Sequence, residues 1–207
     1  RHVRWNWDPS YHYMNFFQFA ELLKAKIRAT GATAYDLVGH SMGGLDIIAA
    51  TMLDRRVDQE PEVQRFITTE PLEGTRTIVT VATPFRGSPL AKIVKRTKLD
   101  EIVSPNWSDG IRSQSEAMSP DSPFIRIITE PTRQRRLVER ARGGVHTFGS
   151  CNDPATPDDA RMIDGAMNHS AGKLKLARHS MILGITQDPR LGLALFEILA
   201  GKIGENS

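Results

Sequence analysis

Cysteine is almost absent from this sequence of 207 residues. Only Cys151 is present, so the chain cannot form an internal disulfide. No uncharged apolar run approaches the roughly 18 residues of a membrane-spanning helix, so we expect no transmembrane segment. The sequence begins at Arg1 without an initiator methionine or an apolar signal core, and it therefore carries no readable cellular address.

The chain also has little net charge, because its positive and negative side chains nearly balance. The formal net charge is only +3 and the pI is near 9.2, an imbalance too small to indicate an anionic partner. Hydrophobic residues make up 40% of the chain, which excludes a disordered protein. Because domains usually contain roughly 100–200 residues, we expect residues 1–207 to form a single domain.

Predicted helices and strands alternate along the chain. Apolar residues recur at three- and four-residue spacing in 15–29, which predicts an amphipathic helix ended by Gly31. The β-branched run at 76–82 is typical of a central parallel strand. Similar patterns predict strands at 35–38, 145–150 and 170–176, and helices at 45–53, around 133–142 and at 189–199. This alternation predicts an α/β fold with a mostly parallel sheet flanked by helices.

Proline and serine interrupt the regular pattern between residues 86 and 130. We interpret this stretch as a loop-rich excursion over the surface of the domain. In parallel sheets the loops at the carboxyl ends of the strands converge on the functional site. Candidate functional residues are therefore expected directly after the predicted strands.

A turn typical of a catalytic serine follows the strand at 35–38. Residues 39–43 read Gly-His-Ser-Met-Gly, the G-x-S-x-G pattern, with a strand before it and a helix after it. Gly39 and Gly43 lack a Cβ, and we expect this to let the chain pass closely beneath the serine. Ser41 is the predicted nucleophile, and the backbone N–H of Met42 is expected to face an oxyanion. The alternative is an incidental serine in a glycine-rich connection.

A serine nucleophile needs a histidine base, oriented by a carboxylate, and in this kind of fold the chain order is serine, acid, histidine. His179 follows the weak strand at 170–176 and is predicted to be the base. His169 precedes that strand, so we expect it at the opposite edge of the sheet as a solvated surface residue. His146 lies within a predicted strand and is expected to be a packed or surface residue.

Two aspartates are candidates for the acid. Asp153 comes directly after the strand at 145–150 and is therefore expected at the carboxyl end of that strand. Asp164 is closer to His179 in the chain and is followed by Gly165 and loop residues. We favour Asp153, and Asp164 stays the alternative.

Five arginines lie between residues 133 and 142, a pattern that can indicate binding of nucleic acid or anionic lipid. Glutamates lie among them and just upstream, and the aromatic residues that would stack on bases are missing. We therefore expect a solvated helix face and no nucleic-acid partner.

Four segments together resemble α/β-hydrolase lipases: V-G-H-S-M-G-G at 38–44, V-A-T-P-F-R-G-S-P at 81–89, G-S-C-N-D at 149–153 and H-S-M-I-L at 179–183. The T-P-x-x-G-S stretch is similar to one that bacterial lipases and lecithin:cholesterol acyltransferase-like enzymes carry after the strand that follows the nucleophile helix. The resemblance covers only the carboxyl-terminal part of the family pattern. The family's earlier strands, and the loop that donates a second oxyanion N–H, have no counterpart here, so we expect an amino-terminally incomplete member.

The resemblance implies hydrolysis of carboxylic esters of lipids through an acyl-serine intermediate, with no metal and no organic cofactor. Ser41 would attack the ester, His179 would move the proton, and Asp153 would orient the imidazole. The expected partner is a lipid or another ester, met through transient contact with a lipid interface, and secretion fits the same family.

The resemblance also assigns residues 86–130 to a lid-like segment or to the wall of an acyl pocket. On this interpretation, Phe85 and Leu90 would contact the substrate. Two other functions fit the same residues: acyl transfer to an alcohol, and a catalytically dead interaction module that keeps the fold.

Overall fold

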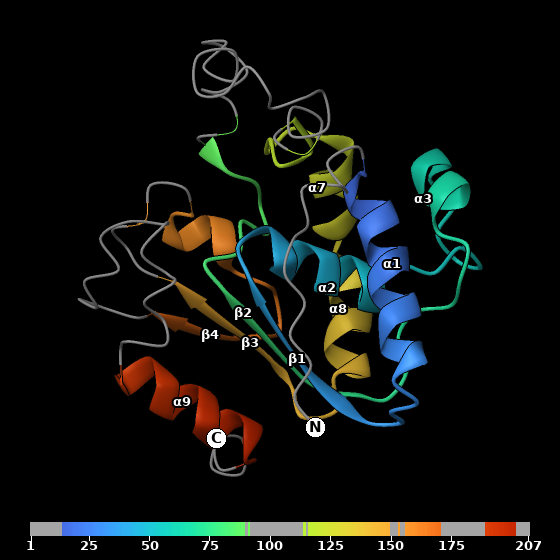
Figure 1. Cartoon of the computed structure of the whole chain (residues 1–207). Helices are drawn as coiled ribbons and strands as arrows, with labels where there is room; N and C mark the ends of the chain where they lie inside the picture. The colour runs from blue at the N-terminus through green and yellow to red at the C-terminus, as the bar shows by residue number, and fades with distance from the viewer. Residues whose placement is uncertain are drawn as a thin grey trace, which may run out of the picture.

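The structure, a computed structural model of the chain, describes residues 14–89, 91, 114, 116–149, 153, 156–170 and 189–201. Its centre is a four-stranded sheet in which every neighbouring pair is parallel. The strands follow each other across the sheet in chain order (Figure 1): β1 (Tyr35–His40), β2 (Thr75–Val81), β3 (Val145–Gly149) and β4 (Met167–Ser170).

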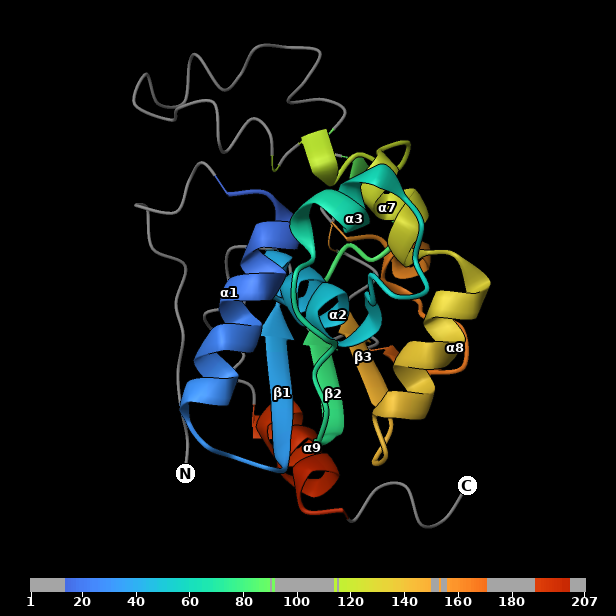
Figure 2. The ribbon, with the colours of Figure 1, turned by 90° about the vertical axis from the view of Figure 1, so that its right-hand side faces the viewer.

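Helices cover both faces of this sheet (Figures 1 and 2). The helices on one side are α1 (Phe16–Ala29), α2 (Met42–Met52), α3 (Pro61–Phe66), α7 (Pro123–Ile128) and α8 (Pro131–Arg140). The opposite face carries α9 (Pro189–Leu199), which packs over β2 and β3. The predicted α/β class, with a parallel sheet flanked by helices, is confirmed.

Helix α1 forms where the apolar spacing predicts it, because both of its ends carry suitable residues. The Asn15 side chain accepts a hydrogen bond from the Gln18 N–H, and the Gln18 side chain accepts one from the Asn15 N–H, each at 3.0 Å. This reciprocal capping box satisfies backbone donors at the start of the helix. Beyond the other end, Gly31 has a φ of 68°, a left-handed conformation that favours glycine.

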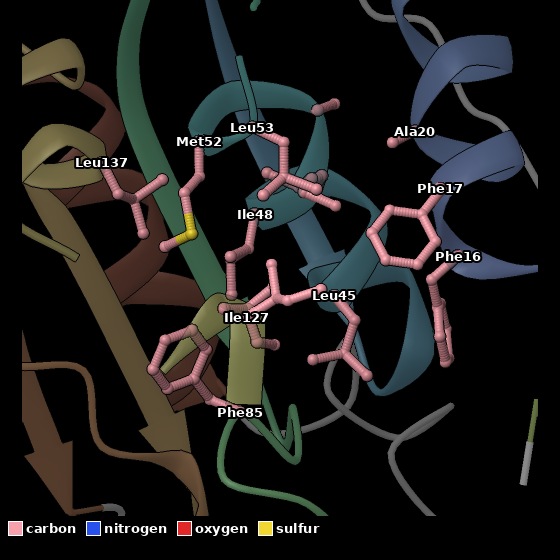
Figure 3. Packing of buried hydrophobic residues seen from close by; sticks show 14 of the residues in the cluster. Phe16, Phe17, Ala20, Leu45, Ile48, Met52, Leu53, Phe85, Ile127 and Leu137 are labelled. Carbon is pink, nitrogen blue, oxygen red and sulfur yellow. The ribbon is translucent and has the colours of Figure 1, made fainter. Parts of the chain in front are cut away.

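The main hydrophobic core lies between the sheet and the helices of the first face. Figure 3 shows apolar side chains of α1 and α2 pointing toward one another, with Leu137 of α8 beside Met52. The Phe124 ring of α7 stacks on Phe16 at a centroid distance of 4.7 Å and meets Phe17 edge-on at 5.4 Å. Aromatic pairs in these geometries stabilise a core beyond the area they bury.

A smaller core lies on the other face of the sheet. Its members come from β2, β3 and α9 and include Val79, Phe148 and Ile198. Since side chains of a strand alternate between the two faces, β2 contributes to both cores: Ile78 to the main one and Val79 to the smaller one. None of the helices in the described residues is long and apolar enough to cross a membrane.

Two sequence expectations change in the structure. A strand occupies 167–170, so it begins three residues before the predicted start at 170, and 171–176 lie outside the described residues. Within the expected surface excursion at 86–130, residues 123–128 form α7, and its four apolar side chains are buried in the main core. Helix α7 therefore belongs to the packed core, and the lid-like interpretation of residues 86–130 stays a prediction. Most of 90–115 lies outside the described residues.

Candidate active site

The carboxyl ends of all four strands meet at one edge of the sheet because the strands are parallel. Ser41 directly follows β1 and Ala82 directly follows β2. Asp153 comes shortly after the end of β3. The sheet thus brings the predicted nucleophile and the predicted acid to the same edge. His179, the predicted base, lies outside the described residues.

The backbone of Ser41 has a conformation that L-amino acids rarely adopt. Its φ is 53° and its ψ is −126°, and it links the end of β1 to the start of α2. Its N–H donates to the Val81 carbonyl of β2 at 2.9 Å, which holds the turn against the neighbouring strand. The side chain makes no capping hydrogen bond to α2. Strain of this kind costs roughly 1–3 kcal/mol and is concentrated at functional sites.

Gly39 and Gly44 allow β1 and α2 to approach each other closely, and only Gly39 is one of the two glycines that we predicted. A Cβ added at Gly39 would lie 2.7 Å from the Gly44 Cα, and one added at Gly44 would lie 2.0 Å from the Thr83 Oγ1. A Cβ at Gly43 would meet nothing within 4 Å. The predicted steric role is therefore confirmed for Gly39 and wrong for Gly43, since it is Gly44 that faces β1 and β2.

Met42 is the first residue of α2. The N–H groups of a first helical turn have no acceptor within the helix, so they are available to an anion. No acidic residue lies in the first turn of α2, so no carboxylate offsets the positive end of the helix dipole. This geometry suits the oxyanion role predicted for the Met42 N–H.

A second strained residue follows β2. Ala82 has a φ of 47°, and within the described part of the chain only Ser41 and Ala82 combine a positive φ with a Cβ. The Ala82 N–H donates to the Phe148 carbonyl of β3 at 2.8 Å. Strained backbone therefore occurs at the carboxyl ends of two neighbouring strands.

The Asp153 carboxyl group lies near the end of β2, and Thr156 lies between the two. The residue is 3% exposed, and Thr156 donates to it twice, through its hydroxyl at 2.7 Å and through its backbone N–H at 3.3 Å. The Thr156 hydroxyl is also 3.3 Å from the Ala82 carbonyl oxygen. Sequence reasoning missed Thr156. The available signal was an aspartate followed three residues later by a threonine, a spacing at which side-chain and backbone bonds form locally.

Asp164, the alternative acid, has a different environment. Its side chain is 66% exposed and forms an ion pair with the exposed Arg86 at 2.9 Å. A carboxylate that orients a catalytic imidazole is usually buried. The structure therefore favours Asp153 over Asp164 for this role.

His169 is not the surface residue at the opposite edge that we expected. It lies within β4, and the pairing register places His40, Val81, Phe148 and His169 in one row across the sheet. With strands roughly 4.8 Å apart, β1 and β4 are separated by about 14 Å, too far for this imidazole to reach Ser41.

The His169 ring instead stacks on Phe148 at 4.5 Å, and its Nε2 lies 3.0 Å from the Nδ1 of the fully buried His146. Burial lowers the pKa of both histidines, which favours their neutral forms. His146, which we expected to be either packed or at the surface, is packed. The error for His169 arose because β4 begins earlier than predicted.

Of the two residues expected to contact the substrate, only Phe85 is described. Its side chain has no exposed surface and belongs to the main core (Figure 3). This favours a packing role for Phe85. Leu90 lies outside the described residues.

The arginines of α8 do not form the solvated face that we expected. The Arg133 side chain is 8% exposed and pairs with Asp58 and Glu60. Arg136 also pairs with Asp58. These arginines are bonded to carboxylates from the segment that follows α2, and only their sequence neighbours such as Arg135 face solvent.

Among the residues that the structure describes, no group of three or more histidine, cysteine, aspartate or glutamate side chains could hold a metal ion.

No protein-family model matches the sequence, and no curated protein matches it. Solved structures do match the fold. Mature lipase BlEst2 of Bacillus licheniformis is 14% identical, with a TM-score of 0.55 over 86% of this chain and 75% of that chain. The metagenomic carboxyl esterase MGS0156 is 17% identical, with a TM-score of 0.58 over 94% of this chain and 64% of that chain.

Serine hydrolase CCSP0084 of Cycloclasticus zankles is 13% identical, with a TM-score of 0.52 over 90% of this chain and 71% of that chain. At such low identity these similarities concern the fold. The lecithin:cholesterol acyltransferase-like branch stays a prediction from the sequence motifs. Together with the parallel sheet and the strained turn after β1, the similarities show that this chain has the α/β-hydrolase fold.

Proposed function

We propose that the protein is a serine hydrolase that cleaves carboxylic esters, including those of lipids, through an acyl-serine intermediate. The observation that carries this proposal is the backbone of Ser41, with a φ of 53° between the end of β1 and the start of α2. Such strain persists only where the surrounding structure enforces it, and here it presents a hydroxyl at the carboxyl edge of the sheet.

In the first half of the proposed reaction, the Ser41 oxygen attacks the ester carbonyl carbon. The imidazole of His179 takes the serine proton and then delivers it to the departing alcohol. Asp153 holds the imidazole in the tautomer that accepts this proton and stabilises the imidazolium that forms. The product of this half is an ester of the acyl group with Ser41.

In the second half, water attacks the carbonyl carbon of the acyl-serine while His179 takes a proton from the water. The bond between that carbon and the Ser41 oxygen then breaks, His179 returns the proton to Ser41, and the carboxylic acid leaves. Both tetrahedral intermediates carry a negative oxygen, and the Met42 N–H at the start of α2 would donate to it. Loss of one such donor typically lowers the rate by about 10²–10³. The fold similarity to proteins described as a lipase and a carboxyl esterase supports the choice of esters as substrate class.

The test is hydrolysis of p-nitrophenyl esters whose acyl chains range from short to long. We expect turnover by the purified protein, an approximately 10⁶-fold loss of kcat in Ser41→Ala, and an approximately 10⁴-fold loss in Asp153→Asn. Asp164→Asn is the matched control and should keep its activity, because its carboxylate is exposed and paired with Arg86.

Adding an alcohol acceptor to the same assay separates hydrolysis from acyl transfer, because only transfer yields a new ester. A folded protein without turnover on any chain length, or a Ser41→Ala variant as active as the parent, would contradict the proposal.

A further inference from the structure

Thr156 joins the predicted acid to the end of β2. It has no exposed surface, and its hydroxyl oxygen lies 2.7 Å from the Asp153 Oδ2 and 3.3 Å from the Ala82 carbonyl oxygen. Its backbone N–H lies 3.3 Å from the second carboxyl oxygen of Asp153 and also 3.3 Å from the Asp153 main-chain carbonyl oxygen, so this donor is shared between the two. One residue thus contacts both oxygens of the buried carboxyl group and the backbone of the neighbouring strand.

The chemistry of the hydroxyl decides how these contacts are used. Both neighbours of the Thr156 oxygen are acceptors when Asp153 is ionised, and a hydroxyl has one hydrogen to donate. The carboxylate is the closer and the charged acceptor, so it receives that hydrogen. Because each carboxylate oxygen then has a donor from Thr156, the plane of the carboxylate is fixed by this residue.

The same contact connects the acid to the nucleophile turn. Ala82, whose carbonyl meets the Thr156 hydroxyl, is adjacent to Val81, whose carbonyl accepts the Ser41 N–H at 2.9 Å. The Ala82 N–H is bound to the Phe148 carbonyl of β3 at 2.8 Å, so this corner of the chain is held from two sides. A change at Thr156 therefore acts on the acid and on the strand end that supports Ser41.

We propose that Thr156 is a positioning residue of the active site: its hydroxyl fixes the Asp153 carboxylate in the plane from which it orients the catalytic imidazole. Thr156 takes no part in bond making, and it acts through Asp153. The inference rests on the function proposed above, in which Asp153 is the acid.

The test compares kcat and KM for p-nitrophenyl ester hydrolysis, with kcat expressed per site titrated by a fluorophosphonate so that unfolded protein is not counted. Thr156→Val removes the hydroxyl at nearly constant volume, and Thr156→Ala removes it in a smaller side chain. Because hydrogen bonds to charged groups and small misplacements of catalytic groups both have large effects on rate, we expect an approximately tenfold lower kcat in both variants, with KM unchanged.

Thr156→Ser keeps the hydroxyl and should retain most of the parent kcat. Thr51→Val is the matched control, because Thr51 is also fully buried and its hydroxyl donates at 2.9 Å to the Ile47 carbonyl within α2. We expect Thr51→Val to keep the parent kcat per titrated site, even if its stability falls.

An active parent protein with an unchanged kcat in Thr156→Val and Thr156→Ala overturns the positioning role while leaving the proposed function intact. A Thr156→Ser variant as impaired as these two also overturns it, because the hydroxyl would then not be the responsible group. A folded parent protein that neither hydrolyses esters nor reacts with the fluorophosphonate overturns the proposed function and this inference together.

Discussion

The carboxyl edge of the sheet and the outer flank of α8 both bury carboxylates, but the bonds that hold these carboxylates differ. At the edge, Asp153 is held by the hydroxyl and the N–H of Thr156, next to strained backbone at Ser41 and Ala82. On the flank, two groups of ion pairs are joined by a hydrogen bond from the Asp54 N–H to the Asp58 carboxylate, and we call them together the flank cluster: Asp54, Asp58, Glu60, Arg133, Arg136 and Arg140.

This difference separates two uses of a buried charge. Asp58 is bonded to two guanidinium groups and also accepts the Asp54 N–H, so its charge is neutralised and its position is locked. The bonds from Thr156 to Asp153 come from neutral donors, which fix a carboxylate without cancelling its charge. We infer that the flank cluster anchors α8 to the segment after α2, whereas the edge holds a carboxylate that can still act on a third group.

The largest effect on stability is expected from breaking the flank cluster. Arg133→Met removes one of the two arginines bonded to Asp58, whose side chain is 3% exposed. Removing one partner of a buried ion pair usually costs about 3–5 kcal/mol, and because Arg136 still pairs with Asp58 and Glu60 is partly exposed, we expect a loss of about 3 kcal/mol. Urea unfolding should show this loss, while kcat per titrated site should not change.

Arg135→Met is the matched control for this experiment, because Arg135 lies on the same helix and is exposed. Exposed substitutions usually change stability by less than about 0.5 kcal/mol. Equal stability losses in the two variants would contradict the anchoring role of the flank cluster.

At the carboxyl edge, Gly44 is a position sensitive to substitution. In Gly44→Ala the new methyl group would lie 2.0 Å from the Thr83 Oγ1, so α2 and the end of β2 must move apart. Overpacking of this kind costs about 1–3 kcal/mol, and displacement of the nucleophile should lower kcat by about 10²-fold.

Gly43→Ala is the matched control. A Cβ there meets nothing within 4 Å, so this variant should be as stable as the parent protein or more stable. If the two variants behave alike, the close approach at Gly44 does not support the turn.

Acid titration should distinguish Asp54 from exposed aspartates. Hydrogen bonds from the Arg56 side chain lower the pKa of Asp54 to about 2. The pKa of Asp54 in the folded protein is below its unfolded value near 3.9. Asp54 therefore stabilises the fold fully at pH values above about 3.9, and this stabilisation is lost as the pH falls toward 2. Because Arg56 is 58% exposed, solvent screens the pair, and we expect Asp54→Asn to cost only about 1–2 kcal/mol at pH 7.

This cost should shrink when unfolding is measured at pH 3, where the parent protein loses the same contribution. Asp164→Asn should show little cost at either pH. A cost for Asp54→Asn that does not vary with pH would show that its charge is not what stabilises the fold.

The smallest predicted effect is a gain of stability within α2. Asp46 is 9% exposed, and its Oδ1 has no hydrogen-bond partner among the residues that the structure describes. Burial raises its pKa well above the ordinary value. The contribution of protonated Asp46 to the stability of the fold is therefore full at low pH. It is lost as the pH rises from the pKa of Asp46 in the unfolded chain toward its pKa in the folded protein. Asp46→Asn removes this loss and should stabilise the protein by about 1 kcal/mol at pH 8 in thermal unfolding. A destabilised variant at that pH would indicate that the carboxylate is needed.

The nucleophile turn could be predicted from the sequence because its signal is local. A strand, five residues of pattern and a helix suffice to locate Ser41 and the start of α2. The prediction of Gly43 in place of Gly44 was wrong, because the close approach depends on which glycine faces Thr83, a residue that follows β2.

Errors elsewhere also come from contacts between distant parts of the chain. Arg133 is 75 residues from Asp58, and Thr156 is 74 residues from Ala82. Neither pairing leaves a local pattern, so the arginines of α8 were expected to be solvated and the contact of Thr156 with the end of β2 was missed. The predicted position of His169 was wrong because the strand begins three residues earlier than predicted. His169 therefore lies within β4 and not before it.

The most direct test of the account is the site of covalent labelling by a fluorophosphonate, mapped by mass spectrometry of the digested protein. We predict a single adduct on Ser41, absent in Ser41→Ala and formed much more slowly in His179→Ala. His169→Ala should be labelled at the parent rate, because β4 places that imidazole too far from Ser41. An adduct on another residue, no adduct in the folded parent protein, or undiminished labelling of His179→Ala would contradict the account.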